Sequence, residues 1–189
     1  MRSTETLIKR TEMVQMHEFF LSKIELALTE KRHIEATWLI YACMENRFFR
    51  TLQKYKKICM FCKGNSKCAS NKNDLAISTK NSCIKRLVEE GVPAVANNFS
   101  IELLEEIRLW VKKRNELMHK LLSVEAYMST DDEFESSALK GKELLDRLYA
   151  ACTGFRADFY AEDYEFFFPE KAMRACPCNP TLRNRNIDK

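Results

Sequence analysis

Three polar side chains close together in the sequence, Arg114, Asn115 and His119, have the chemistry to bind and cleave a phosphodiester. Histidine titrates near neutral pH, so it can take a proton from a 2′-hydroxyl or give one to a 5′-oxygen. Arginine presents a planar, permanently charged fork that binds phosphate oxygens in pairs. Cleaving RNA without a metal ion requires a proton carrier and positive charge at the phosphorane-like transition state. Both residue types are present here.

The stretch that carries these residues, 99–123, predicts one long amphipathic helix. Ser100 is a suitable N-cap, and neither Gly nor Pro interrupts residues 101–123. On a helical wheel Arg114 lies in the middle of an apolar stripe, whose members fall within about 60° of it: Leu103, Ile107, Trp110, Val111, Leu117, Met118 and Leu121. Such an arginine needs a carboxylate, a phosphate or a partner chain, because an unpaired buried charge costs several kcal/mol.

A second predicted helix, 33–55, carries a misplaced charge of the opposite sign. Glu45 lies in the middle of its apolar face, which consists of Ile34, Trp38, Tyr41, Ala42, Phe48, Phe49 and Leu52. One interpretation is a Glu45–Arg114 ion pair that fixes the register of the two helices. The other is that Glu45 supports the site by orienting Arg114 at an active cleft.

The run Arg114-Asn115-Glu116-Leu117-Met118-His119 resembles the signature of the HEPN family (higher eukaryotes and prokaryotes nucleotide-binding). The resemblance covers the helical body, about residues 4–168. It implies a metal-independent endoribonuclease with no catalytic cofactor, active as a homodimer. Five residues on an ideal helix separate two side chains by about 140°, so one straight helix does not bring Arg114 and His119 together. In the family, a dimer unites two copies of the motif across one cleft.

The same resemblance implies roles for each residue and for the whole protein. His119 would be the base or acid, Arg114 would bind the scissile phosphate, and Asn115 would hydrogen-bond the substrate or the partner's motif. The RNA product would end in a 2′,3′-cyclic phosphate. The expected biological role is a toxin or anti-phage effector, with an antitoxin or defence-system partner. Leu121 stands where one branch of the family has a tyrosine that is modified, so that mode of control is not expected.

Other interpretations of these residues stay open. A HEPN-like module that no longer cuts would bind RNA or nucleotides, or serve as a scaffold, through the same Arg114 and Asn115. In the plainest interpretation His119 is only an exposed helix-end residue. A remote one is a di-iron carboxylate bundle, because Glu30-x2-His33 and Glu116-x2-His119 have the spacing of its ligands. Glu116 points to the polar face of its helix, which argues against that site.

The whole chain fits an all-α protein, an antiparallel bundle of four to five helices. Its 189 residues suit one domain, with 46% hydrophobic and 31% charged residues and a net charge of only +4. Helices are predicted over residues 4–29, 33–55, 74–90 and 99–123, and a last one from a cap at Ser129-Thr-Asp-Asp-Glu to about residue 168. Residues 169–189 are predicted to form a flexible basic tail outside the domain, 1–168. With no signal peptide and no membrane span expected, the predicted location is the cytoplasm.

A Cys- and Lys-rich loop, about residues 56–73, interrupts the helical pattern between the second and third helices. Cys59-x2-Cys62 has the spacing of half a structural zinc site, which Cys68 with Cys83 or the Cys176-Pro177-Cys178 pair would complete. A zinc-stabilised interaction domain is the corresponding function. Free thiols and a redox role are the alternatives for these cysteines. The lysines are either a solvated loop or a strip for an RNA backbone.

Overall fold

The chain is mostly helical. The computed structural model describes residues 4–55, 76–121, 131–161, 175–176 and 179–183. The helices in this part are α1 (Thr4–Thr29), α2 (His33–Tyr55), α3 (Ile77–Glu89), α4 (Pro93–Ala96), α5 (Ile101–Lys120) and α6 (Asp131–Ala161). The predicted helical class is thus confirmed. The short helix α4 was not predicted, and the Cys- and Lys-rich loop lies outside the described residues.

The predicted tail contains a short two-stranded antiparallel ladder that the sequence analysis did not anticipate. Strand β1 (Ala175–Cys176) pairs with β2 (Asn179–Arg183), with Ala175 opposite Arg183 and Cys176 opposite Asn179. Strands this short leave no alternating apolar pattern, so sequence periodicity cannot reveal them. Pro180 is tolerated in β2 because both strands of a two-stranded sheet are edges.

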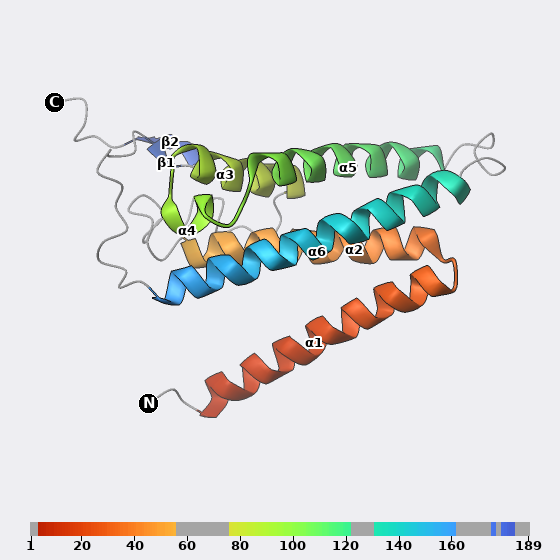
Figure 1. Cartoon of the computed structure of the whole chain (residues 1–189), viewed down its shortest axis with the longest axis horizontal. Helices are drawn as coiled ribbons and strands as arrows, with labels where there is room; N and C mark the ends of the chain where they lie inside the picture. Colours follow the sequence, from red (N-terminus) through yellow and green to blue (C-terminus); the bar gives the residue numbers. More distant parts are fainter. Residues whose placement is uncertain (1–3, 56–75, 122–130, 162–174, 177–178, 184–189) are drawn as a thin grey trace.

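The four long helices, α1, α2, α5 and α6, lie roughly lengthwise along the molecule (Figure 1). α1 and α5 run in one direction, whereas α2 and α6 run in the other. Helices that follow one another among these four are therefore antiparallel, but α2 and α6, which share the most extensive interface, point the same way. α1 packs chiefly on α2, and its N-terminal end diverges from the other helices (Figure 1).

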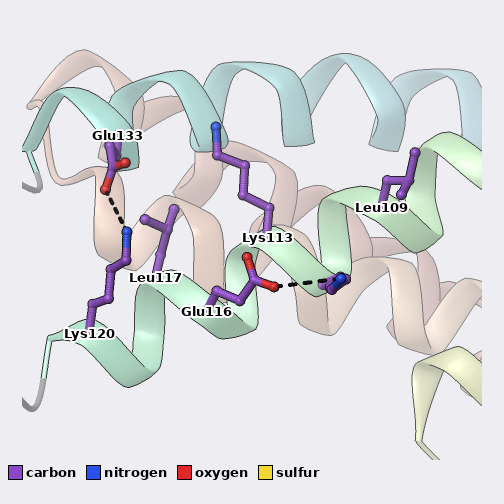
Figure 2. A pocket seen from close by; sticks show the side chains of 7 residues that line it. Leu109, Lys113, Glu116, Leu117, Lys120 and Glu133 are labelled. Atoms are coloured by element: carbon purple, nitrogen blue, oxygen red, sulfur yellow. Dashed lines mark ion pairs between the residues drawn. The ribbon is translucent and has the colours of Figure 1, made fainter.

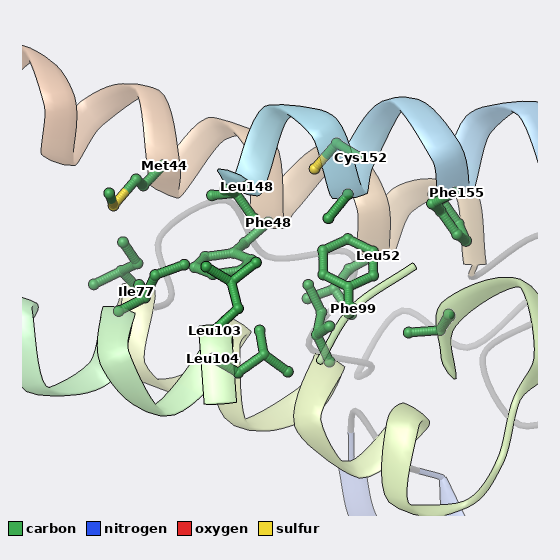
Figure 3. Packing of buried hydrophobic residues seen from close by; sticks show 14 of the residues in the cluster. Met44, Phe48, Leu52, Ile77, Phe99, Leu103, Leu104, Leu148, Cys152 and Phe155 are labelled. Atoms are coloured by element: carbon green, nitrogen blue, oxygen red, sulfur yellow. The ribbon is translucent and has the colours of Figure 1, made fainter. Parts of the chain in front are cut away.

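The main core lies where α2 and α6 face α3 and α5. Figure 3 shows Phe48 and Leu52 of α2 between Leu103 of α5 and Cys152 of α6. Each large apolar side chain buried in this way contributes about 1.5–3 kcal/mol. Phe155 and Phe159, near the C-terminal end of α6, are core residues at 1% and 4% exposure.

Two local features position α5 within this core. Its N-cap is formed as predicted, because the Ser100 hydroxyl accepts a hydrogen bond from the Leu103 amide at 3.1 Å. Further along, the Trp110 indole N–H donates to the Ser137 carbonyl at 2.8 Å. A Cβ at Gly141 would lie 2.6 Å from the Trp110 ring, so only glycine lets α6 approach α5 this closely.

The predicted apolar face of α2 is only partly buried. Ile40, Met44, Phe48 and Leu52 are in the core, but Ile34 and Trp38 are 37% and 53% exposed. The N-terminal turns of α2 therefore leave part of this face uncovered. None of the helices in the described part of the chain has an apolar stretch long enough to cross a bilayer.

Candidate anion-binding site at Arg114

Arg114 is buried on α5, where it faces α2. The side chain is 7% exposed. Its guanidinium carbon lies 4.6 Å from the ring centroid of Trp38 and 4.6 Å from that of Tyr41. Contacts of this kind are worth about 0.5–2 kcal/mol each. Aromatic rings, and not a carboxylate, therefore hold this charge in the helix interface.

The hydrogen-bonding capacity of Arg114 is largely unused. Nη1 donates to the Oδ1 of Asn115 at 3.1 Å, whereas Nε and Nη2 are buried and have no hydrogen-bond partner among the described residues. A buried donor left without an acceptor costs about 1–3 kcal/mol. Burial also lowers the pKa of Arg114, an effect that Tyr41 partly offsets. The guanidinium remains charged, because arginine does not deprotonate in proteins. These two donors thus require an acceptor that the described part of the fold does not supply.

Glu45 does not provide that acceptor, and the predicted Glu45–Arg114 ion pair is not formed. The Oε1 of Glu45 lies 3.0 Å from the Nζ of Lys80 on α3. Lys80 is 1% exposed and Glu45 33%, so the carboxylate neutralises a cation that is deeper than itself. The prediction failed because α3, whose polar pattern gave no sign of a buried lysine, packs against α2 beside Glu45. Arg114 meets α2 about one turn earlier, at Tyr41.

Glu45 nevertheless remains electrostatically linked to the site through Tyr41. Burial raises the pKa of the Tyr41 hydroxyl, Glu45 raises it further, and Arg114 lowers it. Tyr41 is therefore a neutral phenol at physiological pH, since its ordinary pKa is already 10.0. A neutral ring keeps its electron-rich face available to the guanidinium without adding a formal negative charge.

The structure brings two of the three predicted catalytic residues together and leaves the third apart. Asn115 contacts Arg114 directly and is exposed. His119 is exposed in the last turn of α5, and the described contacts of Arg114 do not include it. This separation agrees with the angle of about 140° expected for five residues on a helix.

An open pocket of about 330 Å³ lies along the polar side of α5 (Figure 2). It is lined by Leu109, Lys112, Lys113, Glu116, Leu117, Lys120 and Glu133. Ion pairs join Glu116 to Lys112 at 3.9 Å and Lys120 to Glu133 at 3.7 Å. Lys113 extends from α5 toward α6 in Figure 2. The pocket places three lysines on the helix that carries Arg114 and His119, and a phosphate backbone would compete with the two glutamates for Lys112 and Lys120.

Trp38 and Tyr41 are the functional candidates that the sequence analysis missed. Both lie on the apolar face predicted for residues 33–55, and neither was assigned a role from the sequence. Their spacing of three residues puts them on one side of a helix. Two aromatic residues with that spacing can form a platform for an arginine in the apolar stripe of a neighbouring helix. The sequence identifies that arginine as Arg114 only once it is known that α2 faces α5.

No metal centre is gathered in the described part of the chain. Glu30, His33, Glu116 and His119 all lie there, yet no three His, Cys, Asp or Glu side chains within it are arranged to hold an ion. The predicted zinc ligands Cys59, Cys62, Cys68 and Cys178 fall outside the described residues. Cys83 is described and lies buried on α3.

Comparisons of the chain with known proteins found no matching family model, no matching curated protein and no matching solved structure. The HEPN resemblance therefore rests on six residues and on their place in a helical protein.

Proposed function

We propose that the chain is a metal-independent endoribonuclease of the HEPN type that works as a homodimer. The observation that carries the proposal is the guanidinium of Arg114, which is buried and has two donors without acceptors in the described part of the fold. A phosphodiester supplies acceptors and a negative charge to such a fork. Trp38, one of the two rings on Arg114, is 53% exposed, so rotation of a surface side chain would open the guanidinium to a ligand.

The proposed reaction uses only side chains. Arg114 binds the non-bridging oxygens of the scissile phosphate and stabilises the charge that builds there. One histidine takes the proton of the 2′-hydroxyl as its oxygen attacks phosphorus. The bond to the 5′-oxygen breaks, and a second histidine gives that oxygen a proton. The products are a 2′,3′-cyclic phosphate and a free 5′-hydroxyl.

A dimer supplies the second histidine. Within one chain His119 is exposed and does not contact Arg114, so the cleft requires the motif of another copy. Asn115, exposed beside Arg114, is placed to hydrogen-bond the substrate or that second copy. By the family resemblance, the biological role would be a toxin or an anti-phage effector controlled by an antitoxin or defence-system partner.

The second candidate is a module that binds RNA or nucleotides without cutting. The separation of Arg114 from His119 within the chain favours it, because anion binding needs only the guanidinium and Asn115. In that case the pocket lysines Lys112, Lys113 and Lys120 would contact the nucleic-acid backbone. Both candidate functions involve RNA bound at Arg114, but only the nuclease requires His119.

The deciding experiment incubates end-labelled single-stranded RNA with the protein in excess EDTA and maps the product ends. The wild type is expected to cut and leave cyclic phosphate. His119→Ala is expected to cut about 10²- to 10⁴-fold more slowly while keeping its helical fold. His33→Gln, which alters a histidine outside the motif, serves as the matched control and should keep the wild-type rate. Full activity in His119→Ala would refute the mechanism, whereas RNA binding without cleavage by any variant would identify the binding module.

A further inference from the structure

A second group of polar side chains lies between α1, α2 and α6, away from Arg114. The hydroxyl of Tyr149 and the Nδ1 of His17 are 2.7 Å apart, and their rings meet edge to face at 5.5 Å. The guanidinium carbon of Arg47 lies 4.1 Å from the centroid of the Tyr149 ring. The Nε of Arg47 is buried and has no hydrogen-bond partner among the described residues. Helices from both ends of the chain thus converge on one arginine.

Two more arginines add to the positive charge at this point. Arg50 follows Arg47 by three residues on α2, and Arg156, on α6, is near enough to His17 for its charge to lower the pKa of that imidazole. The pKa of His17 is lowered from 6.5 to about 4, first by burial and then by Arg47, Arg50 and Arg156. His17 is therefore neutral at physiological pH, and the three guanidiniums supply three positive charges.

These three arginines differ from others on the surface in their carboxylate partners. Arg32 pairs with Glu30 and Glu35, Arg108 with Glu105, and Arg147 with Glu106 and Glu143. Arg47, Arg50 and Arg156, by contrast, make no ion pair with a carboxylate in the part of the chain that the structure describes. Like charges on one surface repel unless an anion neutralises them.

The hydrogen-bonding groups that this site offers a ligand are also of one kind, namely donors. When neutral His17 accepts the Tyr149 O–H at Nδ1, its remaining ring nitrogen, Nε2, carries the hydrogen and is a donor. The guanidiniums have donors only. A fitting ligand therefore consists of acceptors and carries more than one negative charge. A phosphate monoester or a pyrophosphate meets both conditions, whereas a single carboxylate brings only one charge.

We propose that His17, Arg47, Arg50 and Arg156 form a binding site for a terminal phosphate or pyrophosphate group. This site is distinct from the one at Arg114. On α2, Arg47 and Arg50 lie about 120–180° around the helix axis from Trp38 and Tyr41, the residues that hold Arg114. The phosphate group comes either from a free nucleotide-like molecule or from the phosphorylated end of a nucleic acid.

His17 provides a local reporter for testing this site. The chain has three histidines, so the imidazole proton resonances can be assigned and followed by NMR as the pH is varied. Inorganic pyrophosphate is titrated into the wild type and into Arg114→Gln, which separates this site from the proposed nuclease site. Bound pyrophosphate should raise the pKa of His17 from about 4 toward 6.5 in both proteins, because an anion offsets the three arginines.

Variants then test which charges bind the anion. Arg50→Gln and Arg156→Gln should each weaken pyrophosphate binding about tenfold or more, as measured by calorimetry. Arg147→Gln removes the same charge from a carboxylate-paired arginine on α6 and should leave binding unchanged. A His17 resonance that does not respond to pyrophosphate, or an equal loss in Arg147→Gln, would overturn the proposal.

Short single-stranded RNAs with a 5′-phosphate or a 5′-hydroxyl distinguish the two sources of the phosphate. A His17 response that requires the 5′-phosphate would identify a nucleic-acid end as the ligand. A response to pyrophosphate but to neither RNA would identify a free small molecule. Both outcomes support the site and assign its ligand.

Discussion

Arg114 and Arg47 are held in the fold by the same contact but differ in their charged surroundings. Each guanidinium lies over aromatic rings, at 4.6 Å for Arg114 and 4.1 Å for Arg47, and each has a buried Nε without a hydrogen-bond partner in the described structure. Arg114 stands beside the neutral amide of Asn115. Arg47 stands with two further arginines. The first arrangement suits the single charge of a phosphodiester, and the second suits a terminal phosphate.

Lys80 shows what a buried cation looks like when its role is structural. It is 1% exposed, and the Glu45 carboxylate lies 3.0 Å from its Nζ. Its charge is thus satisfied within the fold, whereas those of Arg114 and Arg47 are satisfied only in part. Among these three cations, the one with a carboxylate partner supports the fold, whereas the two arginines with buried unpaired donors are the ones assigned to ligands.

The largest expected effect is on catalysis. Arg114→Gln should lower the single-turnover rate of RNA cleavage about 10²- to 10³-fold, because the charge that stabilises the transition state is lost. Arg47→Gln should leave that rate unchanged, since its site lies on another side of α2. Equal losses in both variants would show that the two arginines serve one site, which would remove the distinction between them.

The next largest effect is on stability. Glu45→Ala should lower the free energy of unfolding by up to about 3 kcal/mol, because it removes the carboxylate that faces buried Lys80. The double variant Glu45→Leu/Lys80→Met should recover much of this loss. Arg114→Met should be nearly neutral, because the gain from removing buried donors that lack partners offsets the loss of the two ring contacts. Urea denaturation measures all three, and a large loss in Arg114→Met would assign Arg114 a structural role.

A smaller effect is the pH dependence that His17 imposes. The unfolded chain binds a proton at His17 near pH 6.5, whereas the folded chain binds it only near pH 4. The stability that depends on neutral His17 is therefore complete above pH 6.5 and declines as the pH falls toward 4. His17→Gln should reduce this decline in urea melts at pH 4.5 to 7. An unchanged slope would mean that His17 titrates normally in the fold.

The smallest expected effect is a gain in stability. Arg47 and Arg50 are three residues apart on α2, where like charges cost about 0.2–0.5 kcal/mol. Without ligand, Arg50→Gln should therefore raise the free energy of unfolding slightly, while Arg147→Gln, which loses two carboxylate partners, should not. Thermal melts of the two variants test this, and a destabilised Arg50→Gln would show that Arg50 has a structural partner.

The sequence predicted the helices far better than the contacts between them. The bounds predicted for α1 and α2 from apolar periodicity are the observed ones, and Ser100 marks the start of α5. These signals are local, because capping and amphipathic spacing act within a few residues. The wheel also placed Arg114 correctly in the buried stripe of α5.

The partners of the charged residues could not be predicted in the same way. Glu45 was paired with the nearest misplaced charge in the sequence pattern, but its partner Lys80 lies on α3, whose apolar face gives no sign of a buried lysine. His17 is likewise separated by 132 positions from its partner Tyr149. Such contacts depend on how helices cross, which periodicity does not specify.

The most direct test of the central claim is RNA binding by Arg114 measured apart from cleavage. In excess EDTA and in a His119→Ala background, the affinity for a short single-stranded RNA with 5′-hydroxyl ends is compared with and without Arg114→Gln. We predict that His119→Ala binds the RNA and that adding Arg114→Gln weakens binding about tenfold or more. Equal affinity in the two proteins would contradict the claim that the partly unpaired guanidinium of Arg114 is a phosphate-binding group.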